Sequence, residues 1–138
     1  MSTSRKVFIN LSIDNLQRSV AFFSSLGFSF NAQFTSADTT CMIVSDEAFV
    51  MLLEKPRFKA FITKDIVDTS KAVEALIALS CDSREEVDHL VKTALDNGGS
   101  AAMPVQDLGF MYGSSFYCPD GHHWEVFWMN PDHVHTEA

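Results

Sequence analysis

Glu125 carries the side chain in this sequence that is best suited to chemistry, and it closely follows two histidines, His122 and His123. A carboxylate in an apolar pocket can act as a general acid or base, and a His-His-x-Glu order also suggests a metal site. Adjacent residues of a strand point to opposite faces, so the two histidines cannot both bind an ion that Glu125 binds. His123 can share its face, and a metal site would then need a further ligand such as Cys118 or His89.

The element that positions Glu125 is a predicted strand over residues 123–129, where apolar residues alternate with other types. One face of this strand carries His123, Glu125 and Phe127, and the other carries Trp124, Val126 and Trp128. The large apolar set belongs against helices, so we expect Glu125 to point into a concave cavity.

The sequence repeats itself at about half its length. Residues 9–15 match residues 77–83 at an offset of 68, with Ile, Leu, Ser and Asp identical, and residues 44–46 echo residues 118–120 at an offset of 74. Two half-domains of this size are too small to hold good separate cores, so we expect them to pack together around a shared site.

Each half reads as a β-α-β-β-β unit. The strands predicted in the first half are 7–13, 28–34, 40–44 and 49–53, and those in the second are 76–81, 101–105, 111–118 and 123–129. Asp14 is expected to cap the first helix and Gly27 to end it, while Ser83 and Glu86 form a capping box for the second.

We therefore predict one α+β domain, 1–138, in which two tandem β-α-β-β-β modules form a concave cavity. The modules are residues 6–54 and 76–131, and a connector, 55–75, joins them and has room for a short helix.

Composition limits the classes of partner. The net charge of −8 and the absence of Lys/Arg clusters argue against nucleic acid, and no apolar run has membrane-spanning length. Residues 1–6 lead directly into a strand pattern without a secretory hydrophobic region, and the three cysteines are odd in number. We expect reduced thiols and a cytoplasmic protein.

The repeated β-α-β-β-β order, the Ile-x-Leu-Ser-x-Asp opening of each half and the closing Pro-Asp-Gly-x-x-x-Glu, residues 119–125, resemble the vicinal oxygen chelate superfamily. This is the group of glyoxalases, bleomycin-resistance proteins and extradiol dioxygenases, and the resemblance covers roughly residues 6–131. It implies a barrel-like concave face in each half and, in the metalloenzyme members, a divalent ion held by the first and last strand of each half.

The positions that the resemblance assigns to metal ligands are mostly apolar here. They fall on Phe8, Met51, Leu76 and Glu125, and the offsets of the internal repeat pair the same residues, Phe8 with Leu76 and Met51 with Glu125. Phe and Leu cannot bind a divalent ion, Met is a poor ligand for hard cations, and one carboxylate does not hold a metal alone. We therefore expect no metal at the usual site and no cofactor.

Several other residues could contact a ligand in this cavity. By strand parity Asn10 and Ser80 face the cavity with Phe8 and Leu76, although they could instead satisfy each other or Glu125. Tyr112 and Ser114 could orient a ligand at its mouth, or could belong to an ordinary strand edge beside Gly113. The predicted ligand-binding residues are Phe8, Asn10, Met51, Leu76, Ser80, Tyr112, Ser114 and His123, with Glu125 as the catalytic candidate.

Three functions remain open on these residues. The first is metal-independent binding of a small molecule in an apolar, aromatic-lined cavity with one acid. The second is a glyoxalase-like lyase or isomerase in which Glu125 removes a proton next to a carbonyl. The third is a divalent-metal enzyme with non-standard ligands. Family members commonly pair, and exposed strand edges make a homodimer plausible.

Overall fold

The computed structural model describes residues 4–132, and the chain divides into two compact units between Asp68 and Thr69. This division lies inside the predicted connector, 55–75. Part of the connector belongs to the second unit, because the Thr69 hydroxyl donates a hydrogen bond to the Asp120 carbonyl and His122 lies 3.8 Å from the carboxylate of Glu74. Each unit is described below by itself.

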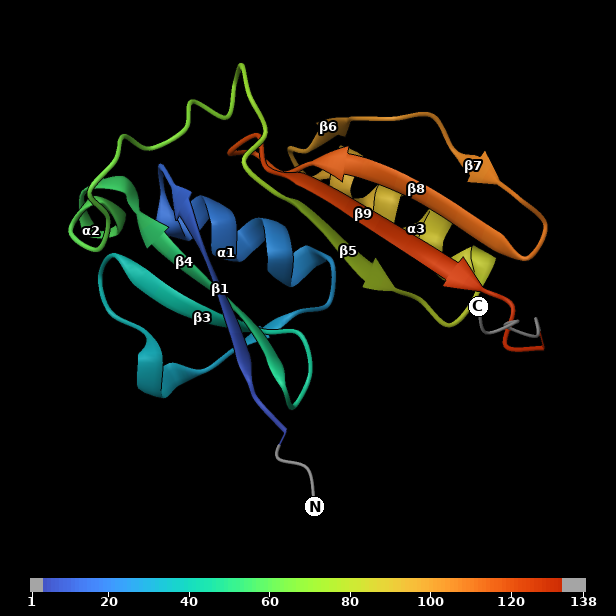
Figure 1. The fold of residues 1–138 in the computed structure, drawn as a ribbon, viewed down its shortest axis with the longest axis horizontal. Helices are drawn as coiled ribbons and strands as arrows, with labels where there is room; N and C mark the ends of the chain where they lie inside the picture. Colours follow the sequence, from blue (N-terminus) through green and yellow to red (C-terminus); the bar gives the residue numbers. More distant parts are fainter. Residues whose placement is uncertain (1–3, 133–138) are drawn as a thin grey trace. The chain divides into compact units, whose positions relative to one another are not determined.

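The first unit is a four-stranded sheet in the order β1-β4-β3-β2 with α1 along one face (Figure 1). β1 runs parallel to β4, and the other neighbours are antiparallel. Its elements are β1 (Val7–Ile13), α1 (Leu16–Ser25), β2 (Ser29–Phe30), the 3-10 helix η1 (Ala32–Phe34), β3 (Thr39–Ile43), β4 (Ala48–Glu54) and α2 (Lys55–Lys59).

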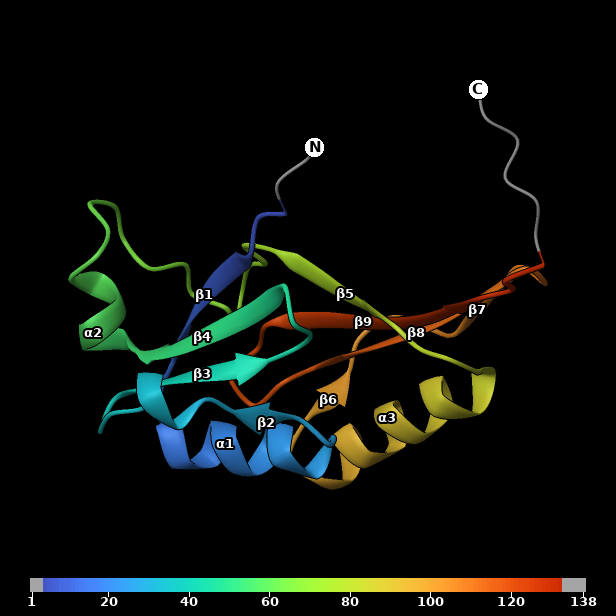
Figure 2. The ribbon, with the colours of Figure 1, turned by 90° about the horizontal axis from the view of Figure 1, so that it is seen from below.

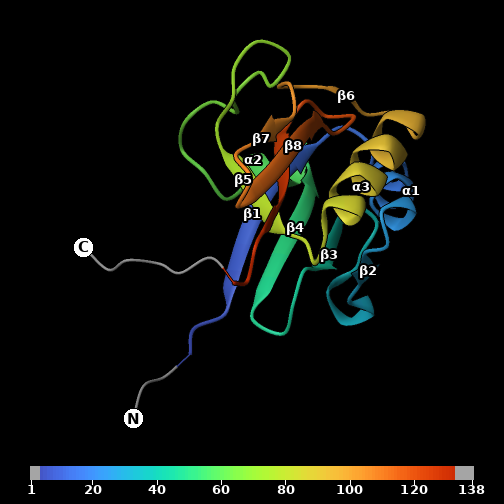
Figure 3. The same cartoon turned by 90° about the vertical axis from the view of Figure 1, so that its right-hand side faces the viewer.

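The second unit repeats this plan in a sheet of order β5-β9-β8-β6, with β7 also paired to β8. β5 runs parallel to β9, and α3 covers one face of the sheet (Figures 2 and 3). Its elements are β5 (Leu76–Ser80), α3 (Arg84–Asp96), β6 (Ser100–Ala101), β7 (Gln106–Asp107), β8 (Met111–Tyr117) and β9 (His123–Met129).

Capping side chains fix where the two long helices begin. The Asn15 side chain accepts a hydrogen bond from the Arg18 N–H, so the cap of α1 lies one residue after the predicted Asp14. Ser83 caps α3 as predicted by accepting from the Glu86 N–H at 3.0 Å. The Glu86 carboxylate accepts in return from the N–H of Asp82, and not from that of the cap residue.

The core of each unit lies between its sheet and its long helix. In the first unit Leu11, Phe22 and Leu52 are almost completely buried, and in the second Val87, Trp124 and Val126 are. These residues carry the apolar periodicity of the sequence, since alternate strand positions and one helix stripe face each other. The fold is of the predicted α+β class.

Two predicted strands are shorter than expected. The 28–34 segment is a strand only at Ser29–Phe30, because Asn31 then caps the 3-10 helix by accepting from the Gln33 N–H. The 101–105 segment pairs only at Ser100–Ala101, and Pro104, which has no N–H for the ladder, follows shortly after. The chain rejoins β8 at β7, which the sequence pattern did not predict.

Burial makes the three cysteines poor nucleophiles. Cys41 and Cys118 are buried, and burial raises the pKa of both thiols; burial and the nearby Glu86 raise the pKa of Cys81 to about 11. In residues 4–132 no helix is long and apolar enough to cross a membrane.

Candidate functional site

Glu125 lies in the middle of β9, between β5 and β8. Its register partners are Ala78 on β5 and Ser115 on β8, so these three side chains share one face of the sheet. The neighbouring positions Trp124 and Val126 are 0% and 1% exposed on the opposite face, beside α3. The alternation predicted for this strand therefore holds, and Glu125 is half-buried on the face away from α3.

A small pocket of about 110 Å³ surrounds this carboxylate. Its walls come from β5, β8 and β9 and from residues 103–106. The lining residues with polar side chains are Gln106, Ser114, Ser115, His123 and Glu125, and the others are Leu76, Met103, Pro104 and Gly113. The pocket thus combines one acid with walls of mixed polar and apolar character.

The Glu125 carboxylate has no hydrogen-bond or ion-pair partner within residues 4–132. The neighbouring Ser115 does have a partner, because its hydroxyl accepts a hydrogen bond from the N–H of Met103 at 2.8 Å. A half-buried carboxylate without a protein donor keeps its acceptor sites for a ligand or for water. This is the main chemical property of the pocket.

The 102–110 segment, which supplies one wall of the pocket, is fixed at its far end by Arg84 of α3. Both terminal nitrogens of the Arg84 guanidinium donate to the Asp107 carboxylate, at 2.8 and 3.1 Å, and one also donates to the carbonyl of Gly109. The same guanidinium lies over the rings of Tyr112 and Trp128. The hydrogen bonds from Arg84 hold the pKa of Asp107 below its usual range.

Tyr112 and Ser114 do not face the same way as Glu125. Their register partners are Trp128 and Val126, so strand alternation places both side chains on the α3 side of the sheet. The Tyr112 hydroxyl donates to Asp88 of α3 at 2.6 Å, and this bond raises the pKa of Tyr112. Ser114 is among the residues that line the small pocket, although its register partner Val126 lies on the α3 side of the sheet.

The other predicted residues of the second unit lie on the Glu125 face. Leu76 is 56% exposed and is the register partner of His123, and both line the small pocket. Ser80 is exposed and is the register partner of Phe127. It lies two residues further along β5 than Ala78, the partner of Glu125, and does not line the pocket. That these residues bind a ligand stays a prediction.

In the first unit the predicted residues share one face of the β1–β4 pair. Phe8 is 47% exposed and stacks on Phe49 with ring centroids 4.8 Å apart. Asn10 is the register partner of Met51, and its side-chain amide donates to the Phe8 carbonyl. Their contribution to a site with Glu125 also stays a prediction.

The donor atoms at these positions do not fit a divalent ion. In the second unit Leu76, on the same face of the sheet as Glu125, has no donor atom in its side chain. The equivalent positions of the first unit are Phe8, which has no donor atom, and Met51, whose thioether is a poor ligand for hard cations. In the described part of the chain no three His, Cys, Asp or Glu side chains are grouped to hold a metal. His123 and Glu125 alone provide fewer protein ligands than a catalytic zinc site uses.

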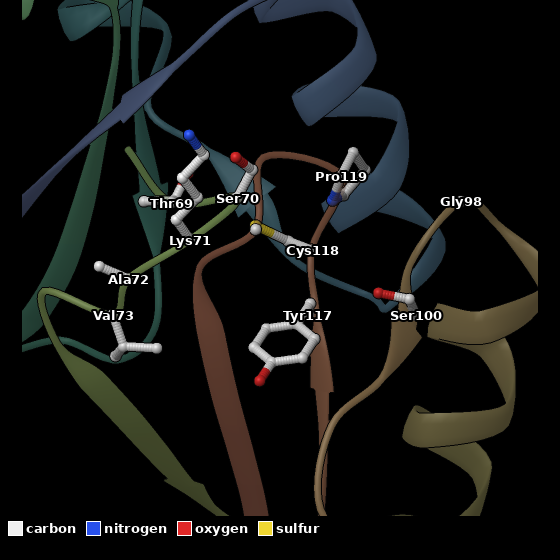
Figure 4. A pocket seen from close by; sticks show the side chains of 11 residues that line it. Thr69, Ser70, Lys71, Ala72, Val73, Gly98, Ser100, Tyr117, Cys118 and Pro119 are labelled. Carbon is white, nitrogen blue, oxygen red and sulfur yellow. The ribbon is translucent and has the colours of Figure 1, made fainter. Parts of the chain in front are cut away.

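A larger pocket of about 410 Å³ lies in the same unit. Its lining comes from residues 69–73, 98–100 and 117–121 (Figure 4). Figure 4 shows the Lys71 amino group and the Ser70 hydroxyl at one end of the view and the Tyr117 ring at the other. The sequence analysis named none of these residues as ligand contacts.

Ser115 could have been found from the sequence. The turn at 119–122 joins two predicted strands as a hairpin, and counting outward from it pairs Tyr117 with His123 and Ser115 with Glu125. The positions of Met103 and Gln106 could not be predicted in this way. Their segment is interrupted by Pro104 and has no strand periodicity from which a register could be counted.

Comparison with known proteins relates the chain to one family. The model described as "Glyoxalase/Bleomycin resistance protein/Dioxygenase superfamily" matches residues 7–126. A hypothetical protein from S. aureus has a similar structure, with a TM-score of 0.77, 24% identity and coverage of 92% of this chain and 95% of that chain.

Two further solved structures are similar at lower identity. A glyoxalase-related enzyme from Fulvimarina pelagi has a TM-score of 0.77 and 16% identity, covering 91% of this chain and 88% of its own. A glyoxalase/bleomycin resistance protein/dioxygenase family enzyme from Burkholderia phytofirmans has a TM-score of 0.73 and 14% identity, with coverage of 88% and 96%. No curated protein gives a significant match. At these identities the structural likeness shows the fold alone.

Proposed function

Because the chain belongs to the glyoxalase/bleomycin resistance protein/dioxygenase superfamily, we propose that it binds a small organic molecule without a metal ion, with Glu125 as the polar anchor. The single observation that carries this proposal is a half-buried carboxylate that lines a pocket and has no partner within residues 4–132.

The chemistry of the pocket limits the ligand. An ionised carboxylate only accepts hydrogen bonds, so the group beside Glu125 must be an N–H or O–H donor or a cation. Leu76, Met103 and Pro104 offer apolar contact around it. An amine, amidine or hydroxyl on an apolar frame fits this description.

Titration of the protein with benzylammonium and with its neutral isostere benzyl alcohol tests the proposal. NMR signals of Leu76 and Ser115 should respond to both probes. Glu125→Gln should weaken benzylammonium about tenfold, the size expected for loss of one charge-assisted hydrogen bond, and should weaken benzyl alcohol less, because the amide oxygen of Gln still accepts a hydrogen bond from a hydroxyl. Glu85→Gln, an exposed change on α3, is the matched control. Unchanged benzylammonium affinity in Glu125→Gln would refute the proposal.

A second candidate function is a glyoxalase-like lyase or isomerase in which Glu125 is the general base. It is favoured by the same free carboxylate, since a base must be able to reach the proton that it removes. Deuterium exchange into hydroxyacetone in D₂O separates the two candidates. Exchange that depends on Glu125, with probe binding retained in Glu125→Gln, would establish catalysis; no exchange above the buffer rate supports binding alone.

We also propose a cytoplasmic homodimer. Cys41, Cys81 and Cys118 form no disulfide within residues 4–132, which supports the first part. The second part is supported by β1 and β5, which are edge strands of their sheets and expose Phe8 and Leu76. Light scattering on the purified protein should give twice the chain mass of 15.4 kDa, and a monomer mass would contradict the dimer.

A further inference from the structure

We propose that the small pocket at Glu125 and the larger pocket at Lys71 are two compartments of one binding site. Its ligand would be an elongated molecule with a cationic or N–H donor group at one end, an apolar or aromatic middle, and an anionic group at the other end. This inference rests on the proposed function of Glu125 and names the class of ligand.

The two pockets meet at one pair of side chains. Tyr117 lines the larger pocket and His123 lines the smaller one. These residues are register partners on β8 and β9, and their ring centroids are 5.2 Å apart. Both lie on the face of the sheet that carries Glu125, so the two pockets are neighbours along one surface.

The connecting segment also runs from one pocket to the other. Val73 lines the larger pocket and Leu76, three residues later, lines the smaller one. Both side chains are more than half exposed, at 52% and 56%. They supply apolar contact on the side opposite β8.

Volume indicates which compartment holds the bulk of the ligand. Sites for small organic molecules usually enclose roughly 300–1,000 Å³. The Glu125 pocket, at about 110 Å³, is too small for more than one end of such a molecule, whereas the larger pocket has about 410 Å³. A ligand anchored at Glu125 therefore extends past Tyr117 and His123.

Charge sets the two ends of the ligand apart. Glu125 offers a carboxylate at one end, and Lys71 offers an ammonium at the other, where Figure 4 shows it beside Ser70. Lys71 has no ion-pair or hydrogen-bond partner in the part of the chain that is described. The middle of the site, at Tyr117 and His123, offers ring faces on which an aromatic group can stack.

The distance along the sheet sets a lower limit on the length of the ligand. His123 is two residues from Glu125, which is about 7 Å along a strand, so a ligand that also reaches Lys71, past Tyr117 and His123, must be longer than one benzene ring. We therefore choose 4′-(aminomethyl)biphenyl-4-carboxylate as the long probe and benzylammonium, which lacks the second ring and the carboxylate, as the short probe.

Calorimetric titration of both probes into matched variants tests the inference. The long probe should bind more tightly than the short one to the unmodified protein. Lys71→Met, and independently Ala72→Trp, which fills the larger pocket, should each weaken the long probe about tenfold and leave the short probe unchanged. Lys92→Met and Ala75→Trp, exposed positions outside both pockets, are the controls, and equal melting temperatures show that all variants are folded.

The outcomes separate this inference from the proposed function. If the short probe responds to Glu125→Gln but the long probe gains nothing from its carboxylate and ignores Lys71→Met, the two pockets are independent and the inference is wrong. If neither probe responds to Glu125→Gln, the proposed function itself fails. Loss of long-probe binding in both Lys71→Met and Glu125→Gln supports one site with two compartments.

Discussion

Glu125 and Asp107 are acidic residues of the same sheet, but their surroundings give them different roles. Asp107 accepts two hydrogen bonds from Arg84 and one from the N–H of Gly109, so its charge holds the 102–110 segment against α3. Glu125 has no such donors among residues 4–132, so its charge is available to a ligand. The same chemical group is held by donors at position 107 and is open to a ligand at position 125 because of the donors around it.

The Arg84–Asp107 pair should make the 102–110 segment sensitive to acid. Because these hydrogen bonds lower the pKa of Asp107 in the folded protein, the contact stabilises the segment above the ordinary aspartate pKa of about 3.9 and is lost as pH falls through the lower folded value. NMR titration of the Asp107 carboxyl should show this low pKa. Arg84→Met should return it towards 3.9, whereas Lys92→Met, which breaks the Lys92–Asp96 pair on the same helix, should not change it. An Asp107 pKa that is unaffected by Arg84→Met would contradict this role.

At the scale of elements, the turn between β8 and β9 decides which residues stand beside Glu125. Cys118, Pro119, Asp120 and Gly121 form this turn, where the Gly121 N–H donates to the Cys118 carbonyl. Gly121 has φ of +82°, and a Cβ there would lie 2.5 Å from the carbonyl oxygen of Thr69. The turn therefore needs glycine both for its backbone conformation and for close packing of residue 69.

Gly121→Ala should lower the free energy of unfolding by about 2 kcal/mol or more, since it adds a steric clash to the strain of a left-handed alanine. Gly109→Ala is the matched control, because Gly109 has φ of +83° and nothing within 4 Å of an added Cβ. It should cost only the backbone strain, about 1 kcal/mol. Urea unfolding of both variants measures the difference. Equal losses would show that the close approach of Thr69 does not matter.

The sequence predicted the helices and strands that have strong periodicity or capping signals. It did not predict segments whose conformation depends on contacts with distant parts of the chain. Strand 123–129 and the faces of Trp124 and Glu125 followed from alternation alone. Composition predicts that Tyr112 and Ser114 belong to the cavity, but the hairpin register turns Tyr112 towards α3, where it bonds to Asp88. Ser114 lines the small pocket although its register partner is Val126. The 102–110 segment has no period, so its contacts with Ser115 and Arg84 could not be predicted.

At the scale of the whole chain, the internal repeat is present as a repeated register. Asn10 pairs with Met51 in the first unit, and Ala78, at an offset of 68 from Asn10, pairs with Glu125, at an offset of 74 from Met51. Both units therefore place the first strand parallel to the last in the same alignment. The duplicated architecture is kept, while the acid Glu125 has the apolar Met51 as its equivalent in the first unit.

This asymmetry supports our proposal that the protein binds its ligand without a metal ion. In the second unit Glu125 is accompanied by Leu76, which has no donor atom, and the equivalent positions of the first unit, Phe8 and Met51, hold no ligand that suits a hard cation. The binding of small molecules should therefore not change when divalent metals are removed by chelation.

Elemental analysis of the purified protein, combined with thermal unfolding in the presence of Mg²⁺, Mn²⁺, Fe²⁺, Ni²⁺ and Zn²⁺, tests this claim most directly. We expect the purified protein to contain far less than one equivalent of any metal per chain. Each ion should change the melting temperature of the unmodified protein and of Glu125→Gln by the same amount. A stoichiometric ion that stabilises the protein and is lost in Glu125→Gln would contradict the account.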